Sequence, residues 1–425
     1  MTSILLRKAQ VVDPRSPYNG QTVDIRIVDE QITAIGEALE AENDEEEVNL
    51  EGLSISPGWV EMHSDFADPG QEERETLQSG SMAALRGGFS TVCLTPNTSP
   101  VIQSKSDIEY IYAKGQVLPV NLYPIGALSR DMKGEEMTEM FDMFSAGAVA
   151  FSDNHNPVTN PNLLKMALLY SKTAQMPVVD FPFEPKLAND GQMNEGHTGT
   201  YLGLKGIPNL SEELIVARDI ELCAYTEGSL HLSRISTAGS VERIRQAKAN
   251  GLNITCDVNL YNLLLTDAAL HEYDSFYKVQ PPLRSEEDRK ALIRGVNDGT
   301  IDAIAVDHNP MDVERKKCEF QHASFGMAYI EQAFGLYGAE LSKEITLETW
   351  VQCLSHGPRE AYNLGPIEIV EGAPAELTVF DSKVSWTANK ADSQSLAYNQ
   401  PFLGKPLQGR AFGIFNKGEY FKTES

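Results

Sequence analysis

Hydrophobic positions in the central part of the chain form short runs that alternate with amphipathic stretches. Each run is rich in β-branched and other apolar residues, and polar residues gather where it ends. The eight runs cover residues 58–63, 90–97, 120–128, 148–153, 177–181, 229–236, 253–258 and 302–308. Strands that alternate with helices indicate a parallel sheet, and eight of them can close a (β/α)8 barrel. We therefore predict an α/β fold built on a TIM-like (β/α)8 barrel.

The two flanks of the chain have a different pattern. Residues 4–13, 21–37, 46–58, 375–383 and 409–421 alternate apolar and polar positions with a period of two, with turn residues between them. Chain termini often lie close together, so both flanks can contribute to one small domain. We predict a composite β-sandwich domain from residues 1–57 plus 345–425, and a barrel from residues 58–344.

Charge and composition narrow the possible functions. The 425 residues carry a formal net charge of −26, which argues against a nucleic-acid backbone or an anionic membrane surface as partner. Part of this excess lies in residues 37–48, which we predict to be a solvated loop or hairpin edge. The five cysteines are scattered, and we find neither a leader nor an apolar run of membrane-spanning length. We expect a cytoplasmic protein with reduced thiols.

Long segments carry a family resemblance. Residues 80–101, 147–154, 190–196, 236–255, 281–292, 302–310 and 399–409 resemble, in this order, the amidohydrolase superfamily and within it the long bacterial dihydroorotases. The resemblance extends over nearly the whole chain. It implies hydrolysis and closure of the cyclic amide of dihydroorotate in pyrimidine biosynthesis, by a hydroxide that zinc activates.

Four positions match metal ligands of this family in a form that could still bind a cation. By the resemblance, His63 is the first histidine of the His-X-His motif, and Asp65 stands in place of the second. Asp153 matches an aspartate ligand after the fourth strand. Asp307 matches the aspartate that is both ligand and general base.

Two other ligand positions have lost their histidines. The fifth-strand histidine corresponds to Phe181, which cannot coordinate a metal, and the sixth-strand histidine corresponds to Arg234. His231 lies three residues before Arg234, and strand alternation predicts that it faces the other way and has a structural role. His308 is expected to point away from the barrel mouth, and His155 to be solvated.

Substrate-contact positions differ from the family as well. The arginine that would clamp the substrate carboxylate is Ala67, and an Asn of the family corresponds to Gln280. A histidine-containing segment is replaced by residues 259–262, and another histidine by Met311. Asn97 remains. Alanine cannot replace a bidentate arginine, so we expect weak binding of the family's substrate.

Electrostatics favours a site without zinc. Asp65, Asp153 and Asp307 together at the barrel mouth would raise one another's pKa unless a cation were present. Arg234 is always protonated and offers five donors, so it can be that cation, and it would repel a divalent ion. We expect no cofactor. The alternative is a divalent Zn, Mn or Mg ion at His63, Asp65, Asp153 and Asp307.

Three functions remain open. The first is a non-catalytic structural or assembly partner in pyrimidine biosynthesis, because the chain resembles pseudo-dihydroorotases that accompany aspartate transcarbamoylase. The second is an active amidohydrolase on dihydroorotate or another cyclic amide, with an unusual His/Asp metal site. The third is a sensor in which Asn97 and Arg234 bind a small anion. We also expect a homo-oligomer, a feature frequent in the family.

Overall fold

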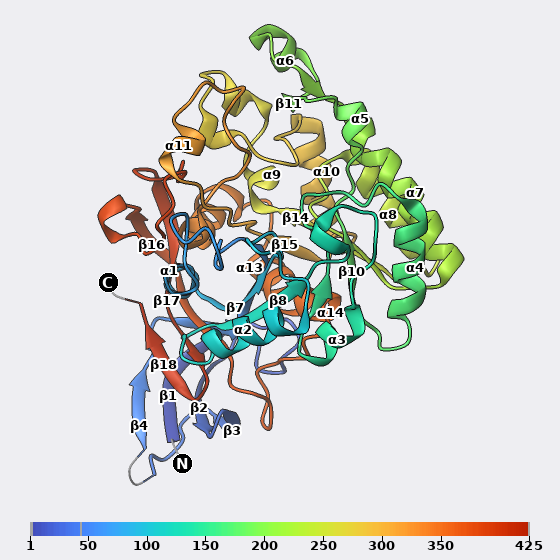
Figure 1. Ribbon diagram of the computed structural model, residues 1–425. Coiled ribbons are helices and arrows are strands. Elements are labelled where there is room, and N and C mark those ends of the chain that lie inside the picture. Colours follow the sequence, from blue (N-terminus) through green and yellow to red (C-terminus); the bar gives the residue numbers. More distant parts are fainter. Residues whose placement is uncertain (1–2, 43–44, 424–425) are drawn as a thin grey trace.

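The first and last segments of the chain join in one sheet (Figure 1). The computed structural model describes residues 3–42 and 45–423. The strand order of the terminal sheet is β18-β17-β16-β5-β1-β2-β3, with β4 paired to β1. The bounds are β1 Ser3–Val11, β2 Thr22–Val28, β3 Gln31–Gly36, β4 Glu46–Asn49, β5 Ser54–Pro57, β16 Leu377–Thr387, β17 Pro406–Asn416 and β18 Glu419–Lys422. These strands enclose a separate apolar core, which confirms the β-sandwich built from both termini.

Eight parallel strands form the second large sheet, in sequential order from β6 to β15 with β11 and β12 apart from it. Their bounds are β6 Trp59–Ser64, β7 Phe89–Leu94, β8 Asn121–Gly126, β9 Ala150–Phe151, β10 Val178–Asp180, β13 Leu230–Leu232, β14 Ile254–Asn259 and β15 Ala303–Ala305. Each lies within or overlaps one of the eight predicted runs. The short β11 Met193–Asn194 and β12 Gly206–Ile207 pair only with each other. The barrel prediction is confirmed.

Helices such as α2, α4, α7 and α8 lie around the outside of this sheet, and α6 and α11 stand above it (Figure 1). The α-helices of the described residues are α1 Leu77–Gly87, α2 Lys105–Gly115, α3 Met140–Ser145, α4 Pro161–Ser171, α5 Pro185–Ala188, α6 His197–Leu202, α7 Leu210–Thr226, α8 Ala238–Ala249, α9 Leu260–Leu264, α10 Glu286–Asn297, α11 Val313–Lys316, α12 Ala333–Leu336, α13 Leu347–Val351 and α14 Gly357–Ala361. α10 shows why the sequence starts a helix there: the Ser285 side chain accepts the N–H of Asp288, and three acidic residues in the first turn complement the helix dipole. None of the helices in the described ranges is long and apolar enough to cross a bilayer.

A carboxylate closes the seam between the first and last barrel strands. Within the described part of the chain, no backbone ladder pairs β6 with β15. Instead, Glu61 of β6 accepts the N–H groups of Val306 (2.7 Å) and Asp307 (3.0 Å) after β15, and that of His63 (3.1 Å). The N–H of Asp65 also donates to the carbonyl of His308. Glu61 therefore replaces part of the missing ladder.

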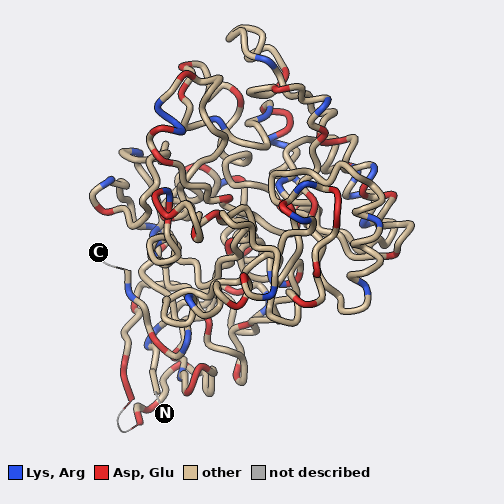
Figure 2. The backbone as a smooth tube through the Cα atoms, viewed as in Figure 1, with Lys and Arg blue, Asp and Glu red and all other residues tan. Residues whose placement is uncertain are grey.

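The acidic stretch lies at the edge of the terminal sheet, where Figure 2 shows acidic residues close to the N-terminal strands. β4 pairs with β1 and with no other strand that the structure describes. The guanidinium of Arg26 donates to Glu45 at 2.8 Å. The predicted edge position is therefore confirmed for the described residues. The predicted domain boundaries stay a prediction: the terminal strands lie outside residues 58–344, but α14, after residue 345, packs against β6.

Candidate functional site

A buried ion pair occupies the C-terminal ends of the barrel strands, where such folds keep their chemistry. Arg234 Nε donates to Asp307 Oδ1 at 2.9 Å, and both side chains are almost fully buried. The other carboxylate oxygen accepts bonds from Asn259 Nδ2 and Tyr261 Oη, both at 3.2 Å. Burial alone would raise the pKa of Asp307, but the charge of Arg234 and the nearby imidazole of His155 outweigh it and lower that pKa. Asp307 is therefore held as a satisfied anion.

A chain of hydrogen bonds links this pair to the end of the first barrel strand. Arg234 Nη2 donates to Asn154 Oδ1 (2.7 Å), and Asn154 Nδ2 donates to Asn97 Oδ1 (2.8 Å). Asn97 Nδ2 in turn donates to Asp65 Oδ2 (2.9 Å), which also pairs with Arg74 Nη2 (2.6 Å). The side-chain groups of Asn97 and Arg234 that take part in this chain are already hydrogen-bonded to other protein groups. No observation favours their use to bind a small anion.

Sequence reasoning missed Arg74. We expected Asp65 to share the cation of Arg234, whereas the structure pairs Asp65 with Arg74, which also donates to Pro310 O and Asn309. Arg74 lies in a charged segment before α1 that has no resemblance to a ligand motif, so no local signal pointed to it. Asp65 and Asp307 therefore do not share one cation: Arg74 pairs with the first and Arg234 with the second.

Asp153 and Phe181 occupy separate surroundings. Asp153 accepts the backbone N–H of Ser129 at 2.8 Å and the Ser129 hydroxyl. Burial raises the pKa of Asp153 to about 6, although these bonds act in the opposite direction. Phe181 stacks on Phe183 and meets the edge of His155 at 5.3 Å between ring centres. His155, which we expected to be solvated, is half-buried: 23% of its side chain is exposed, and its Nε2 lies 3.7 Å from Asp307.

A second polar cluster brings together two histidines and an aspartate. His63 Nε2 and His231 Nε2 both lie 2.8 Å from the same oxygen, Asp257 Oδ2. His231 is buried as expected, and the other oxygen of Asp257 accepts the backbone N–H of Arg234. Strand alternation does not apply to Arg234, because it lies beyond the end of β13 at Leu232 and has a left-handed backbone with φ 58°. Sequence reasoning did not identify Asp257.

The residues present do not fit the zinc centre that the family resemblance implies. The four ligand positions that survive in sequence are satisfied by different protein groups: His63 by Asp257, Asp65 by Arg74, Asp153 by Ser129 and Asp307 by Arg234. Among the residues that the structure describes, only one group of three or more, His63, His231 and Asp257, places possible ligand atoms within 4.8 Å of one another. The predicted alternative set of His63, Asp65, Asp153 and Asp307 therefore does not form a cluster.

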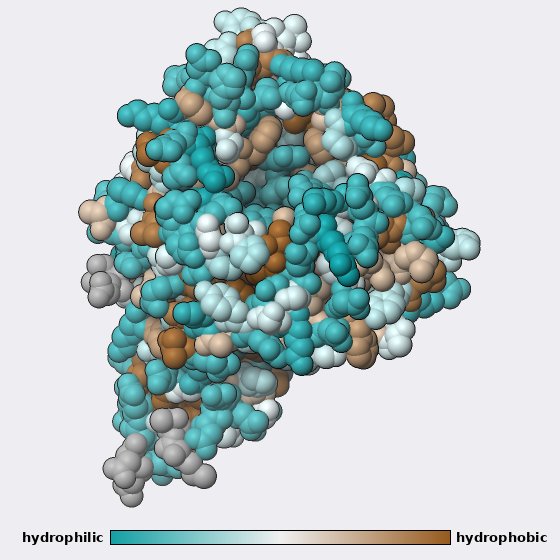
Figure 3. All heavy atoms as spheres, in the orientation of Figure 1, coloured by the Kyte–Doolittle hydropathy of each residue, from teal (hydrophilic) through white to brown (hydrophobic). Residues whose placement is uncertain are grey.

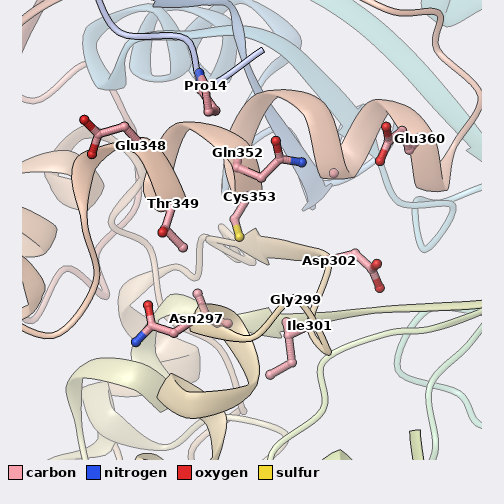
Figure 4. A pocket seen from close by; sticks show the side chains of 12 residues that line it. Pro14, Asn297, Gly299, Ile301, Asp302, Glu348, Thr349, Gln352, Cys353 and Glu360 are labelled. Carbon is pink, nitrogen blue, oxygen red and sulfur yellow. The ribbon is translucent and has the colours of Figure 1, made fainter. Parts of the chain in front are cut away.

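One sizeable pocket lies away from this region (Figure 4). It has a volume of about 310 Å³, and Asn297, Asp302, Gln352 and Glu360 are among the residues that line it. Asp302 directly precedes β15, so the pocket opens at the N-terminal ends of the strands. That end of a barrel serves stability, whereas chemistry belongs to the other end. The pocket is therefore not part of the candidate site.

Sequence similarity to known proteins identifies the family of this chain. A family model described as "Dihydro-orotase-like" matches residues 52–240. The chain is 39% identical over 413 residues to a protein of Geotalea daltonii named dihydroorotase, covering 96% of both chains. It is 41% identical over 408 residues to another of that name from Pelotomaculum thermopropionicum, covering 96% of this chain and 95% of the relative. The chain belongs to the dihydroorotase family.

Solved structures agree on the architecture of this dihydroorotase-family chain. An L-hydantoinase (dihydropyrimidinase) from Arthrobacter aurescens superposes with a TM-score of 0.89 at 20% identity, covering 100% of this chain and 97% of the other. A dihydropyrimidinase from Brevibacillus agri gives a TM-score of 0.84 at 20% identity, covering 99% and 95%. At this identity the likeness shows the fold alone: a barrel with a sandwich domain.

Proposed function

We propose that this dihydroorotase-family chain is a non-catalytic structural partner in pyrimidine biosynthesis, of the kind that accompanies aspartate transcarbamoylase. The observation that supports the proposal is the buried pair of Arg234 and Asp307. By the family resemblance, Asp307 is the residue that would act as general base. A general base must be free to accept a proton near neutral pH, whereas the pKa of Asp307 is lowered and both of its oxygens accept protein donors.

The position of the guanidinium also opposes hydrolysis. Hydrolytic zinc needs three or four ligands and an open position for water. In this chain, Arg234 places a permanent positive charge on Asp307, and Phe181 places a phenyl ring where the family has a ligand. Ala67, where the family clamps a carboxylate, is buried and has no donor to offer in its side chain. These features support a barrel kept for its shape and surface.

The outer surface of two barrel helices supports an assembly role. Exposed apolar side chains occur on α4 and on α7, and these helices pack against each other. They are Met166, Leu169 and Tyr170 on α4, and Leu210, Leu214 and Tyr225 on α7. Figure 3 shows apolar side chains on the side of the molecule where α4 and α7 lie. Exposed apolar side chains on two neighbouring helices are a feature of protein–protein contact sites.

A turnover assay tests the catalytic part of the proposal. We expect purified protein to show no hydrolysis of dihydroorotate above the rate of a matched protein-free blank, with or without added Zn²⁺ or Mn²⁺. The Geotalea daltonii relative named dihydroorotase, assayed in parallel, is the positive control. Metal-dependent turnover by this chain would overturn the proposal.

The same assay decides the second candidate, an active amidohydrolase. The names of the relatives favour it, since proteins 35–41% identical over nearly the full length are called dihydroorotases. Turnover that disappears when Asp307 is replaced by asparagine would establish this alternative.

Co-elution tests the assembly part. Full-length protein mixed with aspartate transcarbamoylase from the same cell should elute as one complex in size-exclusion chromatography. The variant Leu169→Glu/Leu214→Glu places charge on the apolar surface of α4 and α7 and should abolish the complex. Leu396→Glu, at an equally exposed leucine outside these helices, is the control and should leave it intact. Separate elution of the unmodified proteins would contradict an assembly role.

A further inference from the structure

Deep in the barrel, three ligand-type side chains converge on one point. His63 lies on β6, His231 on β13 and Asp257 on β14, and all three are buried. Each imidazole directs Nε2 at the same oxygen, Asp257 Oδ2, at 2.8 Å. We propose that His63, His231 and Asp257 bind one divalent transition-metal ion of the Zn²⁺ type in a buried site. The proposed set shares His63 with the ligand positions that the family resemblance implies, but it replaces the others by His231 and Asp257. The inference does not depend on whether the barrel is catalytic.

The chemistry of the donors suits such an ion. Two imidazole nitrogens and one carboxylate oxygen are ligands that Zn²⁺ takes at about 2.0–2.2 Å, and hard ions such as Mg²⁺ prefer oxygen alone. The three ligand atoms already lie within 4.8 Å of one another, so a central ion requires only small side-chain shifts. Few other side chains compete: among the described residues, Asp257 has ion-pair contacts with these two histidines and with no lysine or arginine.

The outer partners of the two imidazoles fit a metal site. His231 Nδ1 lies 2.8 Å from Thr255 Oγ1, and His63 Nδ1 lies 3.5 Å from the hydroxyl of Tyr362. A metal-bound histidine holds its other ring N–H on a hydrogen-bond partner, which fixes the tautomer. Hydroxyl groups can either donate or accept. Both imidazoles can therefore move their proton from Nε2 to Nδ1 when an ion binds, and neither loses its partner.

The charge of the neighbouring guanidinium is directed elsewhere. Arg234 gives its side-chain N–H groups to Asp307, Asn154 and Ser233, and only its backbone N–H reaches Asp257. The carboxylate of Asp307, 2.9 Å from Arg234 Nε, offsets part of the guanidinium charge that a divalent ion on Asp257 would meet. All three ligands are buried and come from different strands, so the ion would join β6, β13 and β14 and contribute to stability, with its fourth position left to a water.

Metal analysis tests the proposal on the whole protein. Protein expressed with Zn²⁺ in the medium and purified in metal-free buffer should contain one zinc per chain by elemental analysis. Substitution by Co²⁺ should produce visible d–d absorption bands of a low-coordinate, nitrogen- and oxygen-ligated ion. A wild-type protein without bound metal, or without these bands after exposure to Co²⁺, overturns the proposal whatever the variants do.

Matched variants locate the ion. Asp257→Asn and His231→Gln should lose it, and Thr255→Val should bind it about 10–100-fold more weakly, as expected for a lost outer partner. His356→Gln is the control, because His356 is another buried histidine on a carboxylate, 2.9 Å from Asp13, but it has no second histidine. It should keep the metal. Asp307→Asn should keep it as well, and loss of the ion in that variant would place it at the family's hydrolytic centre and overturn the proposal.

Discussion

Replacing Arg234 with methionine is expected to lower the free energy of unfolding by about 3–5 kcal/mol, the range for removing one partner of a buried ion pair. The variant leaves the Asp307 carboxylate buried without its cation, although Asn259 and Tyr261 still donate to it. It also leaves Asn154 Oδ1 without its donor. Urea unfolding followed by circular dichroism measures the change.

The double variant Arg234→Met/Asp307→Asn tests whether charge is the cause. Removing the carboxylate charge removes the need for a cation, so we expect the double variant to recover at least half of the lost stability. Arg245→Met is the control, because it removes an exposed pair with Asp298 and should cost less than about 1 kcal/mol. A loss for Arg234→Met no larger than that of the control would show that the guanidinium does not stabilise the barrel.

Replacing Glu61 with alanine should cost about 3 kcal/mol or more, because three buried backbone N–H groups would lose their acceptor at about 1–3 kcal/mol each. These groups join β6 to the end of β15, where the described strands have no ladder. Equilibrium unfolding should show the loss, and hydrogen exchange should show it first at residues 303–307. An alanine variant as stable as the wild type would contradict the role of Glu61 in closing the barrel.

Glu61→Gln gives a pH-dependent control. Burial raises the pKa of Glu61 from 4.5 to about 7, so the folded state holds this proton more tightly than the unfolded chain. Its contribution to stability is complete below pH 4.5 and is lost as the pH rises to about 7. Glutamine imitates the protonated form, and this part of the pH dependence should be absent from the variant. An unchanged slope in the variant would assign the dependence to other groups.

Arg74 and Arg234 belong to one hydrogen-bonded network at the barrel mouth. Arg74 and Arg234 stand at opposite ends of one hydrogen-bonded chain, each on its own aspartate, with Asn97 and Asn154 between them. A network in which every member is satisfied is rigid, and replacing a single member leaves a buried partner unpaired. We therefore expect this mouth to be preorganised as a solid end of the barrel, in agreement with a scaffold role.

Local sequence patterns were enough to determine the fold. Each apolar run or amphipathic segment reflects the burial of one strand or of one helix face. This pattern is set by residues that are close in the sequence. Eight runs gave eight barrel strands, and the period-two flanks gave the terminal sheet. The family resemblance predicts that Phe181 and Arg234 stand at former ligand positions, because a residue's chemistry can be read without coordinates, and this stays a prediction.

The partners of these residues required the tertiary structure. Arg74 pairs with Asp65 near the end of β6, while Asp257 joins His63 and His231 from strands far apart in the sequence. Such contacts depend on how the closed barrel positions its strand ends, and no local period encodes them. The left-handed backbone at Arg234 and Asp307, with φ of 58° and 54°, further uncouples side-chain direction from strand alternation. The sequence by itself thus determined which chemical groups are present and which elements they belong to, and only the folded chain decided which of them meet.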